Sequence, residues 1–432
     1  MKGTGETGKT ILLAALIAAA VYAAAVGGIG RILPERSAWP EAAQGSAVGP
    51  ETGQARAASV SPENAEDQPV CASPETEESL LSETEKGGYA FFTLGEEDRL
   101  LYEELLDAVT GFSQETVLSV RVQDADRLER IFSCVLADHP EIFYVDGYTL
   151  SVRTAGEEIR SISFQPSYTF SGQQAKERME RVRKAADAVL SGLAPEMDDY
   201  EKLKELYEAV ILGTEYDLQA PENQTICSVF LYGRSVCQGY AKAFQYLCQR
   251  AGIPAVLVTG KTEDGSPHAW TAVRCSGAWY YADPAWGDVS YRKKDTEEGG
   301  AGTEDPPAGE DHAEDRMEQI DYDCFLVTAE EISRTHRADD TFLLPDCRSM
   351  ADNYYVREGL YFTRADRAQV SAAFERAQQE GWRAVTLKCA NESVYEELEE
   401  SLLVSREIFR YLSRETVAYA AAKERLALTF FL

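Results

Sequence analysis

Basic residues are scarce in this sequence, and they form no cluster. The chain carries 42 Lys and Arg against 73 Asp and Glu, which gives a formal net charge of −31. A surface of this charge repels nucleic-acid phosphates and anionic lipid headgroups unless basic side chains gather locally. We therefore expect no nucleic-acid partner, and contact with a membrane only through the apolar N-terminal segment described below.

Metal-binding and disulfide patterns are also missing. None of the nine cysteines has the CxxC or Cys/His spacing that is typical of zinc sites. We therefore expect no metal ion, no other cofactor and no disulfide framework. The sequence also lacks an internal repeat of about 20 to 50 residues, which argues against a repeat architecture. The cysteines still bear on function, because their odd number leaves one thiol unpaired even in a fully paired scheme.

One long apolar run stands near the N-terminus. Residues 11–29 carry no charged side chain and match the length of a helix that spans a bilayer. Lys2 and Lys9 precede the run and favour a cytoplasmic N-terminus with the remainder outside. Ala23–Ala25 also fit a signal-peptide cleavage site, so residues 1–32 are predicted to be either a transmembrane anchor or a removed signal peptide. We expect a cell-membrane protein with an extracytoplasmic domain, or a secreted one if the segment is cleaved.

The remaining sequence predicts folded units separated by low-complexity segments. Residues 33–88 are rich in Pro, Gly, Ala, Ser and Glu, which predicts a disordered linker. Helix and strand patterns over residues 89–171 predict a small N-terminal α+β unit. Helices followed by neighbouring strands predict a central domain with an antiparallel sheet over residues 172–350, interrupted by a disordered insert at 292–318. Residues 351–432 are predicted to form a C-terminal α/β unit.

A cysteine stands at the start of a helix pattern in the central domain. Cys237 lies in "SVCQGYAKAFQYLC", where Tyr240, Phe244 and Leu247 follow the spacing of one buried helix face. Unpaired backbone N–H groups and the positive end of the helix dipole would favour a thiolate at this position. Gly239 would let another group approach the first turn closely. Most cysteines are nevertheless small core residues, so the interpretation as a nucleophile depends on suitable partners.

A histidine and an aspartate are the expected partners. Two aromatic-rich runs flank Ser276 and Gly277, which predict a two-residue hairpin turn. In that register Asp283 pairs with Trp270, and His268 lies diagonally beside Asp283 on the same face. A three-residue loop would place the two on opposite faces. A carboxylate bound to one imidazole nitrogen fixes the tautomer and leaves the other nitrogen to take a thiol proton.

The resemblance to a known family rests on three blocks, "SVCQGYAKAFQYLCQRAGIPAVLVTG", "SPHAWTAVR" and "WYYADPAWGD". Over about residues 176–290 the chain resembles the transglutaminase-like superfamily, a papain-related fold with a Cys-His-Asp triad. The resemblance implies Cys237 as the nucleophile, His268 as the base and Asp283 as the residue that orients it. It also implies the Cys237 N–H as one oxyanion-hole donor. We nominate the Gln224 side chain as the second, with an exposed loop glutamine as the alternative.

The predicted fold class is α+β: a papain-like, transglutaminase-like core with an antiparallel sheet, plus small N-terminal and C-terminal α/β units. The resemblance implies an exported cysteine-dependent amide hydrolase, a peptidase or amidase, that forms a thioester with a peptide, protein or cell-wall amide substrate. A catalytically silent surface-binding module and a protein-glutamine transamidase stay open as alternatives. The sequence does not indicate an oligomeric state. Tyr207 stands where many relatives carry a histidine, and His139, His312 and His336 receive no role.

Overall fold

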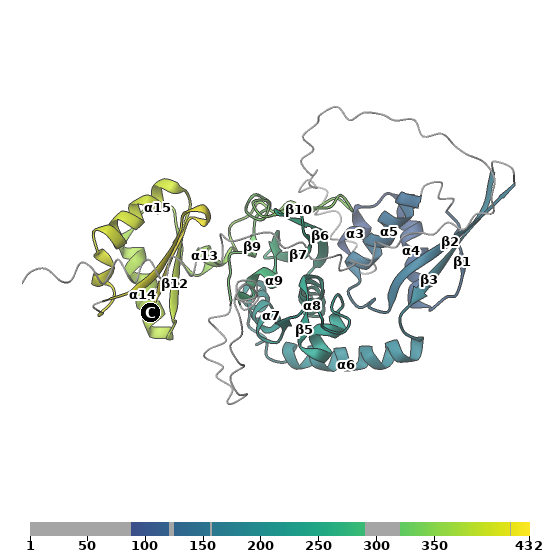
Figure 1. The fold of residues 1–432 in the computed structure, drawn as a ribbon, viewed down its shortest axis with the longest axis horizontal. Helices are drawn as coiled ribbons and strands as arrows, with labels where there is room; N and C mark the ends of the chain where they lie inside the picture. The colour runs from purple at the N-terminus through teal and green to yellow at the C-terminus, as the bar shows by residue number, and fades with distance from the viewer. Residues whose placement is uncertain (1–87, 121–124, 156–157, 290–319, 415) are drawn as a thin grey trace, which may run out of the picture. The chain divides into compact units, whose positions relative to one another are not determined.

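The computed structural model describes residues 88–120, 125–155, 158–289, 320–414 and 416–432 (Figure 1). The described chain divides into two compact units. The larger unit holds residues 88–287 and 323–349, and the smaller unit holds residues 350–432 with two short segments, 288–289 and 320–322.

Three predicted segments fall largely or wholly outside the described residues. They are the anchor or signal peptide at 1–32, all but the last residue of the linker at 33–88, and the insert at 292–318. Among the helices that the structure does describe, none has both the length and the apolar character needed to cross a bilayer.

The larger unit begins with three helices and a three-stranded antiparallel sheet of order β1-β3-β2. These elements are α3 (Tyr89–Thr93), α4 (Glu96–Thr110), β1 (Thr116–Val117), α5 (Ala125–Asp138), β2 (Val145–Ala155) and β3 (Glu158–Tyr168). The helix pattern that starts at Tyr89 is divided, because Leu94 and Gly95 have extended backbone conformations. Three acidic residues in the first turn of α4 then suit the positive end of its dipole.

A buried carboxylate stabilises this helical region. Asp138, the last residue of α5, accepts hydrogen bonds from the backbone N–H of Ala90 and of Phe91, each at 2.9 Å, and from the Tyr102 hydroxyl at 3.0 Å. Burial raises the pKa of Asp138 to about 6, although the two backbone hydrogen bonds act in the opposite direction. A Cβ atom on Gly88 would collide with the Asp138 side chain, so glycine is needed there. Asp138 thereby holds the first turn of α3.

We expect Asp138→Ala to lower the free energy of unfolding by about 2 to 4 kcal/mol, because two backbone N–H groups and one hydroxyl lose their buried acceptor. Urea unfolding followed by circular dichroism measures this loss. Tyr102→Phe is the matched control, since it removes one donor and leaves the carboxylate in place; we expect a cost of about 1 kcal/mol. Equal costs for the two variants would contradict this assignment.

A five-stranded antiparallel sheet forms the centre of the larger unit, in the order β10-β6-β7-β8-β9. Its strands are β6 (Ala255–Thr262), β7 (Pro267–Cys275), β8 (Ala278–Ala282), β9 (Phe325–Val327) and β10 (His336–Ala338). The other elements are α6 (Gly172–Leu190), α7 (Asp199–Leu212), β4 (Glu215–Tyr216), η1 (Ser228–Tyr232), β5 (Arg234–Ser235), α8 (Cys237–Arg250), α9 (Pro284–Gly287) and α12 (Ala329–Ile332). Helix α8 packs against β6 and β7.

The hairpin between β7 and β8 has the predicted two-residue turn. Ser276 and Gly277 both have positive φ angles, 48° and 91°, as a turn of the primed class requires. The strands pair Thr271 with Ala282, so the predicted register is confirmed. The register brings Asp283, directly after β8, to the face that His268 shares.

One apolar core connects the sheet to the N-terminal helices. Leu105 of α4 and Val135 of α5 belong to the same buried cluster as Trp270 and Trp279 of the sheet. Tyr89 contacts Trp279 edge-to-face, with ring centroids 4.7 Å apart. Residues 89–171 therefore help to support the sheet that carries His268.

The smaller unit contains a four-stranded sheet of order β11-β12-β14-β13. Its elements are α13 (Tyr354–Arg357), β11 (Tyr361–Phe362), α14 (Arg367–Glu380), β12 (Ala384–Cys389), α15 (Glu392–Glu399), η3 (Glu400–Val404), η4 (Glu407–Arg410), β13 (Ala418–Ala422), η5 (Lys423–Arg425) and β14 (Ala427–Phe431). The β11–β12 pair is parallel and the other two pairs are antiparallel. With mixed helix and sheet and an antiparallel central sheet, the predicted α+β fold class is confirmed.

Candidate active site

Cys237 is the first residue of α8, next to an extended residue that provides no side-chain cap. Val236 precedes it with φ −113° and ψ 177°. Within the described residues, the Cys237 N–H donates to no backbone or side-chain acceptor, so it is free to bind a substrate oxygen. The residue is 8% exposed. Its position combines limited access with the positive end of a helix dipole.

Gly239 allows a polar cluster to approach the first turn of α8. A Cβ atom at this position would collide with the Ser235 and Ser228 hydroxyls and would press on the Asn223 carbonyl. The two hydroxyls lie 2.6 Å apart, and Ser235 donates to the Asn223 carbonyl at 2.8 Å. The Val236 N–H donates to the same carbonyl at 3.2 Å. The cluster therefore ties the strand that leads into α8 to the loop at residue 223.

The Gln224 side chain belongs to that loop. Gln224 is half-buried. The carbonyl of its neighbour Asn223 accepts hydrogen bonds from Ser235 and Val236, which directly precede Cys237. Its side chain has no hydrogen-bond partner within the described part of the chain. The role of Gln224 as a second oxyanion donor stays a prediction, and its amide is uncommitted in this structure.

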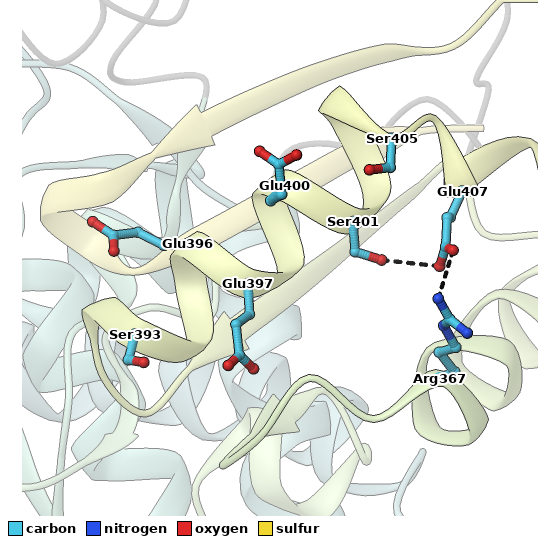
Figure 2. Close-up of a pocket in the computed structure, with 8 residues that line it drawn as sticks. All are labelled: Arg367, Ser393, Glu396, Glu397, Glu400, Ser401, Ser405 and Glu407. Carbon is cyan, nitrogen blue, oxygen red and sulfur yellow. Dashed lines mark hydrogen bonds and ion pairs between the residues drawn. The ribbon is translucent and has the colours of Figure 1, made fainter.

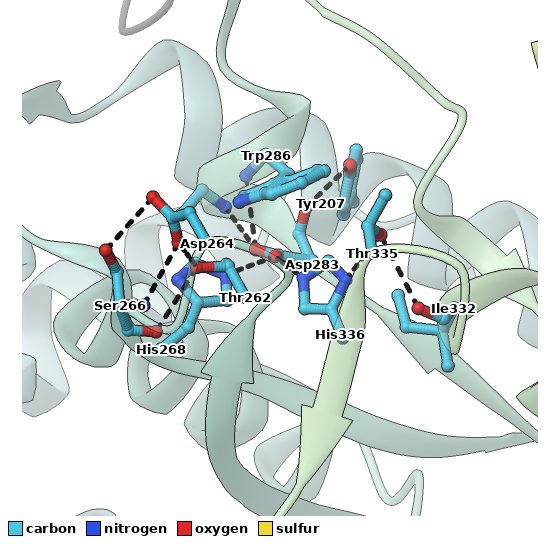
Figure 3. A network of polar contacts seen from close by, with 11 residues as sticks. Tyr207, Thr262, Asp264, Ser266, His268, Asp283, Trp286, Ile332, Thr335 and His336 are labelled. Carbon is cyan, nitrogen blue, oxygen red and sulfur yellow. Dashed lines mark hydrogen bonds and ion pairs between the residues drawn. The ribbon is translucent and has the colours of Figure 1, made fainter. Parts of the chain in front are cut away.

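His268 and Asp283 form a short buried pair (Figure 3). The His268 Nε2 atom lies 2.6 Å from Asp283 Oδ2, and Asp283 is fully buried. Its other oxygen, Oδ1, accepts from the N–H groups of Ala285 and Trp286, at 3.0 and 3.1 Å. The first turn of α9 thus fixes the carboxylate, as a helix N-terminus fixes an acidic cap.

Electrostatics in this pair favour an imidazolium. Burial lowers the pKa of His268, but the charge and hydrogen bond of Asp283, together with the Cys237 sulfur, raise it to about 10. Burial likewise opposes ionisation of Asp283, yet His268 and a second histidine, His336, hold the pKa of this carboxyl below its usual range. Because Nε2 faces the carboxylate, Nδ1 of His268 is left for the Cys237 sulfur. The structure therefore brings the three residues of the predicted triad into one site.

His336 is the residue that sequence reasoning missed. Its side chain is fully buried, and its Nε2 atom lies 3.1 Å from the same Asp283 oxygen that binds His268. Its Nδ1 atom lies 2.7 Å from the Thr335 hydroxyl. Strand β10 carries His336 to this place by pairing it with Thr262 of β6. A three-residue strand among polar neighbours gives little periodicity, so the sequence offered almost no signal for it.

Aromatic side chains enclose the network. Trp270 is almost fully buried, and its ring centroid lies 4.9 Å from that of His336. The Trp286 ring lies 4.6 Å from His336 and 6.0 Å from His268. The Tyr207 hydroxyl donates to the Asp283 backbone carbonyl at 3.0 Å. A Cβ atom on residue 287 would collide with this hydroxyl, so Gly287 leaves room for it. These rings keep water away from the buried charges.

The same three side chains are the one group within the described residues whose atoms are arranged closely enough to hold a metal ion. The ligand atoms of His268, Asp283 and His336 lie within 4.8 Å of one another. Both Nε2 atoms, however, point at a single carboxylate oxygen, at 2.6 and 3.1 Å. This is the geometry of a hydrogen-bond network, and we assign the three side chains to it.

A pocket in the smaller unit has a different character (Figure 2). It has a volume of about 450 Å³ and is lined by Arg367, Ser393, Glu396, Glu397, Glu400, Ser401, Ser405 and Glu407. Arg367 binds Glu407 at 2.6 Å, and Ser401 donates to the same carboxylate. Neither cysteine nor histidine is among the side chains that line this pocket.

The site has the side-chain arrangement of an activated thiol: a thiol at a helix N-terminus, a buried imidazole and a carboxylate. Residues 186–284 match the family described as the Transglutaminase-like superfamily. The matched stretch contains Cys237, His268 and Asp283, and it ends before His336. The predicted transglutaminase-like core is thereby confirmed.

Two curated relatives match a similar length of chain. Kyphoscoliosis peptidase of Mus musculus is 27% identical over 123 residues, which cover 24% of this chain and 19% of that protein. Kyphoscoliosis peptidase of Homo sapiens is 27% identical over 118 residues, which cover 23% and 18%. The chain therefore spans about a fifth of the length of these relatives.

Solved structures also align with the chain. A TGase crystal structure aligns with a TM-score of 0.24 at 13% identity, covering 39% of this chain and 50% of that chain. The periplasmic domain of TgpA from Pseudomonas aeruginosa aligns with a TM-score of 0.20 at 18% identity, covering 33% and 58%. The family assignment rests on the sequence match.

Proposed function

We propose that this chain is a cysteine-dependent amide hydrolase, a peptidase or amidase, in which Cys237, His268 and Asp283 form the catalytic triad. One observation carries the proposal: the 2.6 Å contact between His268 Nε2 and Asp283 Oδ2 within a buried site. That contact leaves Nδ1 to exchange a proton with the thiol at the start of α8. The name of the curated relatives, which are called peptidases, is consistent with hydrolysis.

The proposed reaction has two halves. The Cys237 thiolate attacks the amide carbonyl carbon, and the Cys237 N–H, with Gln224 as the second donor, binds the developing oxyanion. The His268 imidazolium gives its proton to the leaving nitrogen, the C–N bond breaks, and a thioester remains. Neutral His268 then takes a proton from water, which attacks the thioester and releases the acid. The C–S bond breaks, and Cys237 leaves as the thiolate beside the imidazolium that His268 became on taking this proton.

Transamidation shares the first half of this reaction. An incoming amine would attack the thioester in place of water and would give a new amide. We favour water as the acceptor, because the sequence lacks the calcium loops of the cross-linking relatives. A silent binding module remains the third possibility, in which the same buried network has only a structural role.

We further propose that the enzyme acts outside the cytoplasm on peptide, protein or cell-wall amides. The uncharged run at residues 11–29, preceded by Lys2 and Lys9, supports export through an anchor or a signal peptide. Among the eight described cysteines, all but Cys324 are buried. Burial slows oxidation of a thiol, so these cysteines are compatible with an oxidising compartment.

Labelling with iodoacetamide across pH tests the proposal. We expect Cys237 to react at about pH 6 at least tenfold faster than a free thiol of pKa ~8.5, because the raised pKa of His268 keeps the imidazolium beside the sulfur. The His268 imidazolium is present at neutral pH and is lost as the pH rises through about 10. Mass spectrometry of the Cys237 peptide measures the rate.

The other cysteines provide internal controls. Burial raises the pKa of Cys134, Cys227, Cys248 and Cys389, so these thiols should label slowly. Uniformly slow labelling of all cysteines would favour the silent binding module. If Cys237 labels fast, peptide libraries and peptidoglycan fragments are then assayed for cleavage, and a labelled amine is offered with a glutamine-containing protein. Amine incorporation without cleavage would identify a transamidase.

A further inference from the structure

We propose that His336 is a positioning residue of the active site, which fixes the Asp283 carboxylate so that it orients His268. The proposal rests on the proposed function, since it assigns His336 to the same triad. It adds a fourth side chain to the site, from a part of the chain beyond the matched family residues.

Both carboxylate oxygens of Asp283 accept hydrogen bonds (Figure 3). Oδ1 accepts from two backbone N–H groups of α9, and Oδ2 accepts from His268 at 2.6 Å and from His336 at 3.1 Å. Four donors therefore surround one fully buried carboxylate. Rotation of the carboxylate would break several of these bonds at once. His336 donates to Oδ2 at a second position, next to the hydrogen bond from His268.

The tautomer of His336 follows from its other contact. Its Nδ1 atom lies 2.7 Å from the Thr335 hydroxyl, whereas that hydroxyl lies 3.5 Å from the Ile332 carbonyl. The shorter contact is the stronger hydrogen bond, so the hydroxyl donates to Nδ1. His336 then carries a proton on Nε2, facing Asp283.

The surroundings of His336 restrict what else it can do. The titratable groups that face it in the described contacts are Asp283, after β8, and His268 on β7, whose ring centroid lies 5.1 Å away. Trp270 and Trp286 cover its ring, and Thr262 pairs with it from β6. His336 therefore has one polar partner besides Thr335, and that partner is the triad carboxylate.

Loss of the His336 donor should raise the pKa of Asp283. A hydrogen bond to a carboxylate stabilises its charged form, so its removal makes Asp283 easier to protonate. Protonated Asp283 no longer supports the imidazolium, and the thiolate at Cys237 is lost with it. The acidic limb of Cys237 reactivity should therefore move to higher pH, while reactivity in the alkaline range changes little.

The test compares His336→Leu with His336→Gln, whose amide N–H can replace the Nε2 donor. Iodoacetamide labelling of Cys237 in the full chain is measured from about pH 4 to about pH 9. We expect the acidic limb of the Leu variant to move up by about 0.7 pH unit or more, which lowers the labelling rate on that limb roughly fivefold. The Gln variant should restore most of the wild-type profile.

Further variants keep the outcome decisive. Thr335→Val removes the hydroxyl that sets the tautomer of His336. We expect it to move the acidic limb of Cys237 labelling in the same direction as His336→Leu, but by less. If the Leu variant does not fold, the Thr335→Val and His336→Gln variants together test the inference. A folded Leu or Thr335→Val variant with the wild-type profile overturns the inference alone, provided that wild-type Cys237 labels fast. Equal shifts in the Leu and Gln variants also overturn it, because they indicate lost packing. Slow labelling of wild-type Cys237 overturns both this inference and the proposed function.

Discussion

Cys237→Ala is expected to abolish amide cleavage, with a loss of roughly 10⁵-fold or more in kcat. The proposed reaction begins with a covalent bond between the Cys237 sulfur and the substrate carbonyl carbon, and no other described side chain in the site can replace this sulfur. The neighbouring His268 and Asp283 keep their hydrogen bond, so the variant should fold and still bind substrate. The measurement is turnover of the best substrate from the library screen, with KM determined separately from kcat.

Cys248→Ala is the matched control for this substitution. Cys248 lies on the same helix, is fully buried and has no role in the proposed reaction. Its replacement removes one thiol from α8 and should leave kcat within about twofold, with a stability cost of about 1 kcal/mol. Full activity in Cys237→Ala would show that the proposed mechanism is wrong.

Asp283→Asn is expected to lower kcat by roughly 10³- to 10⁴-fold, although it changes the shape of the side chain very little. Its Oδ1 must keep accepting from two backbone N–H groups, so the new amide nitrogen takes the place of Oδ2. That nitrogen points its hydrogens at His268 and His336. His268 must then accept at Nε2 and carry its own proton on Nδ1, facing the sulfur. In this tautomer it cannot take the thiol proton.

The effect of Asp283→Asn is read from kcat and from iodoacetamide labelling of Cys237, which should both fall at neutral pH. Asp264→Asn is the control. Asp264 lies in the turn between β6 and β7 and binds only local groups, Thr262 and Ser266. We expect its replacement to change either rate by no more than about twofold. A wild-type labelling rate in folded Asp283→Asn would argue that Asp283 does not control His268.

Much of the candidate site could be predicted because its geometry is local. The Ser276–Gly277 turn sets the register of one hairpin, and the register alone determines that His268 and Asp283 share a face. The start of α8 is likewise visible in the spacing of its apolar residues. The catalytic roles of these residues and of Gln224 stay predictions until activity is measured.

The remaining features depend on contacts between distant parts of the chain. His336 reaches the site through a three-residue strand that pairs with β6, and a strand this short has no readable period. The break at Leu94–Gly95 was also hidden, because the apolar spacing continues across it. It is stabilised by Asp138, which is 48 residues from Ala90 in the sequence. Tertiary hydrogen bonds of this kind override local propensity.

The strand order β10-β6-β7-β8-β9 has a consequence for biosynthesis. Both edge strands of the sheet lie in residues 323–349, after the segment that interrupts the larger unit. Translation proceeds at about 5 to 20 residues per second, so Cys237, His268 and Asp283 leave the ribosome several seconds before His336 does. The nascent protein thus carries all three residues of the proposed triad while its sheet is still incomplete on both sides. Catalytic competence should arise only late in translation, when the last edge strand docks and secures the carboxylate.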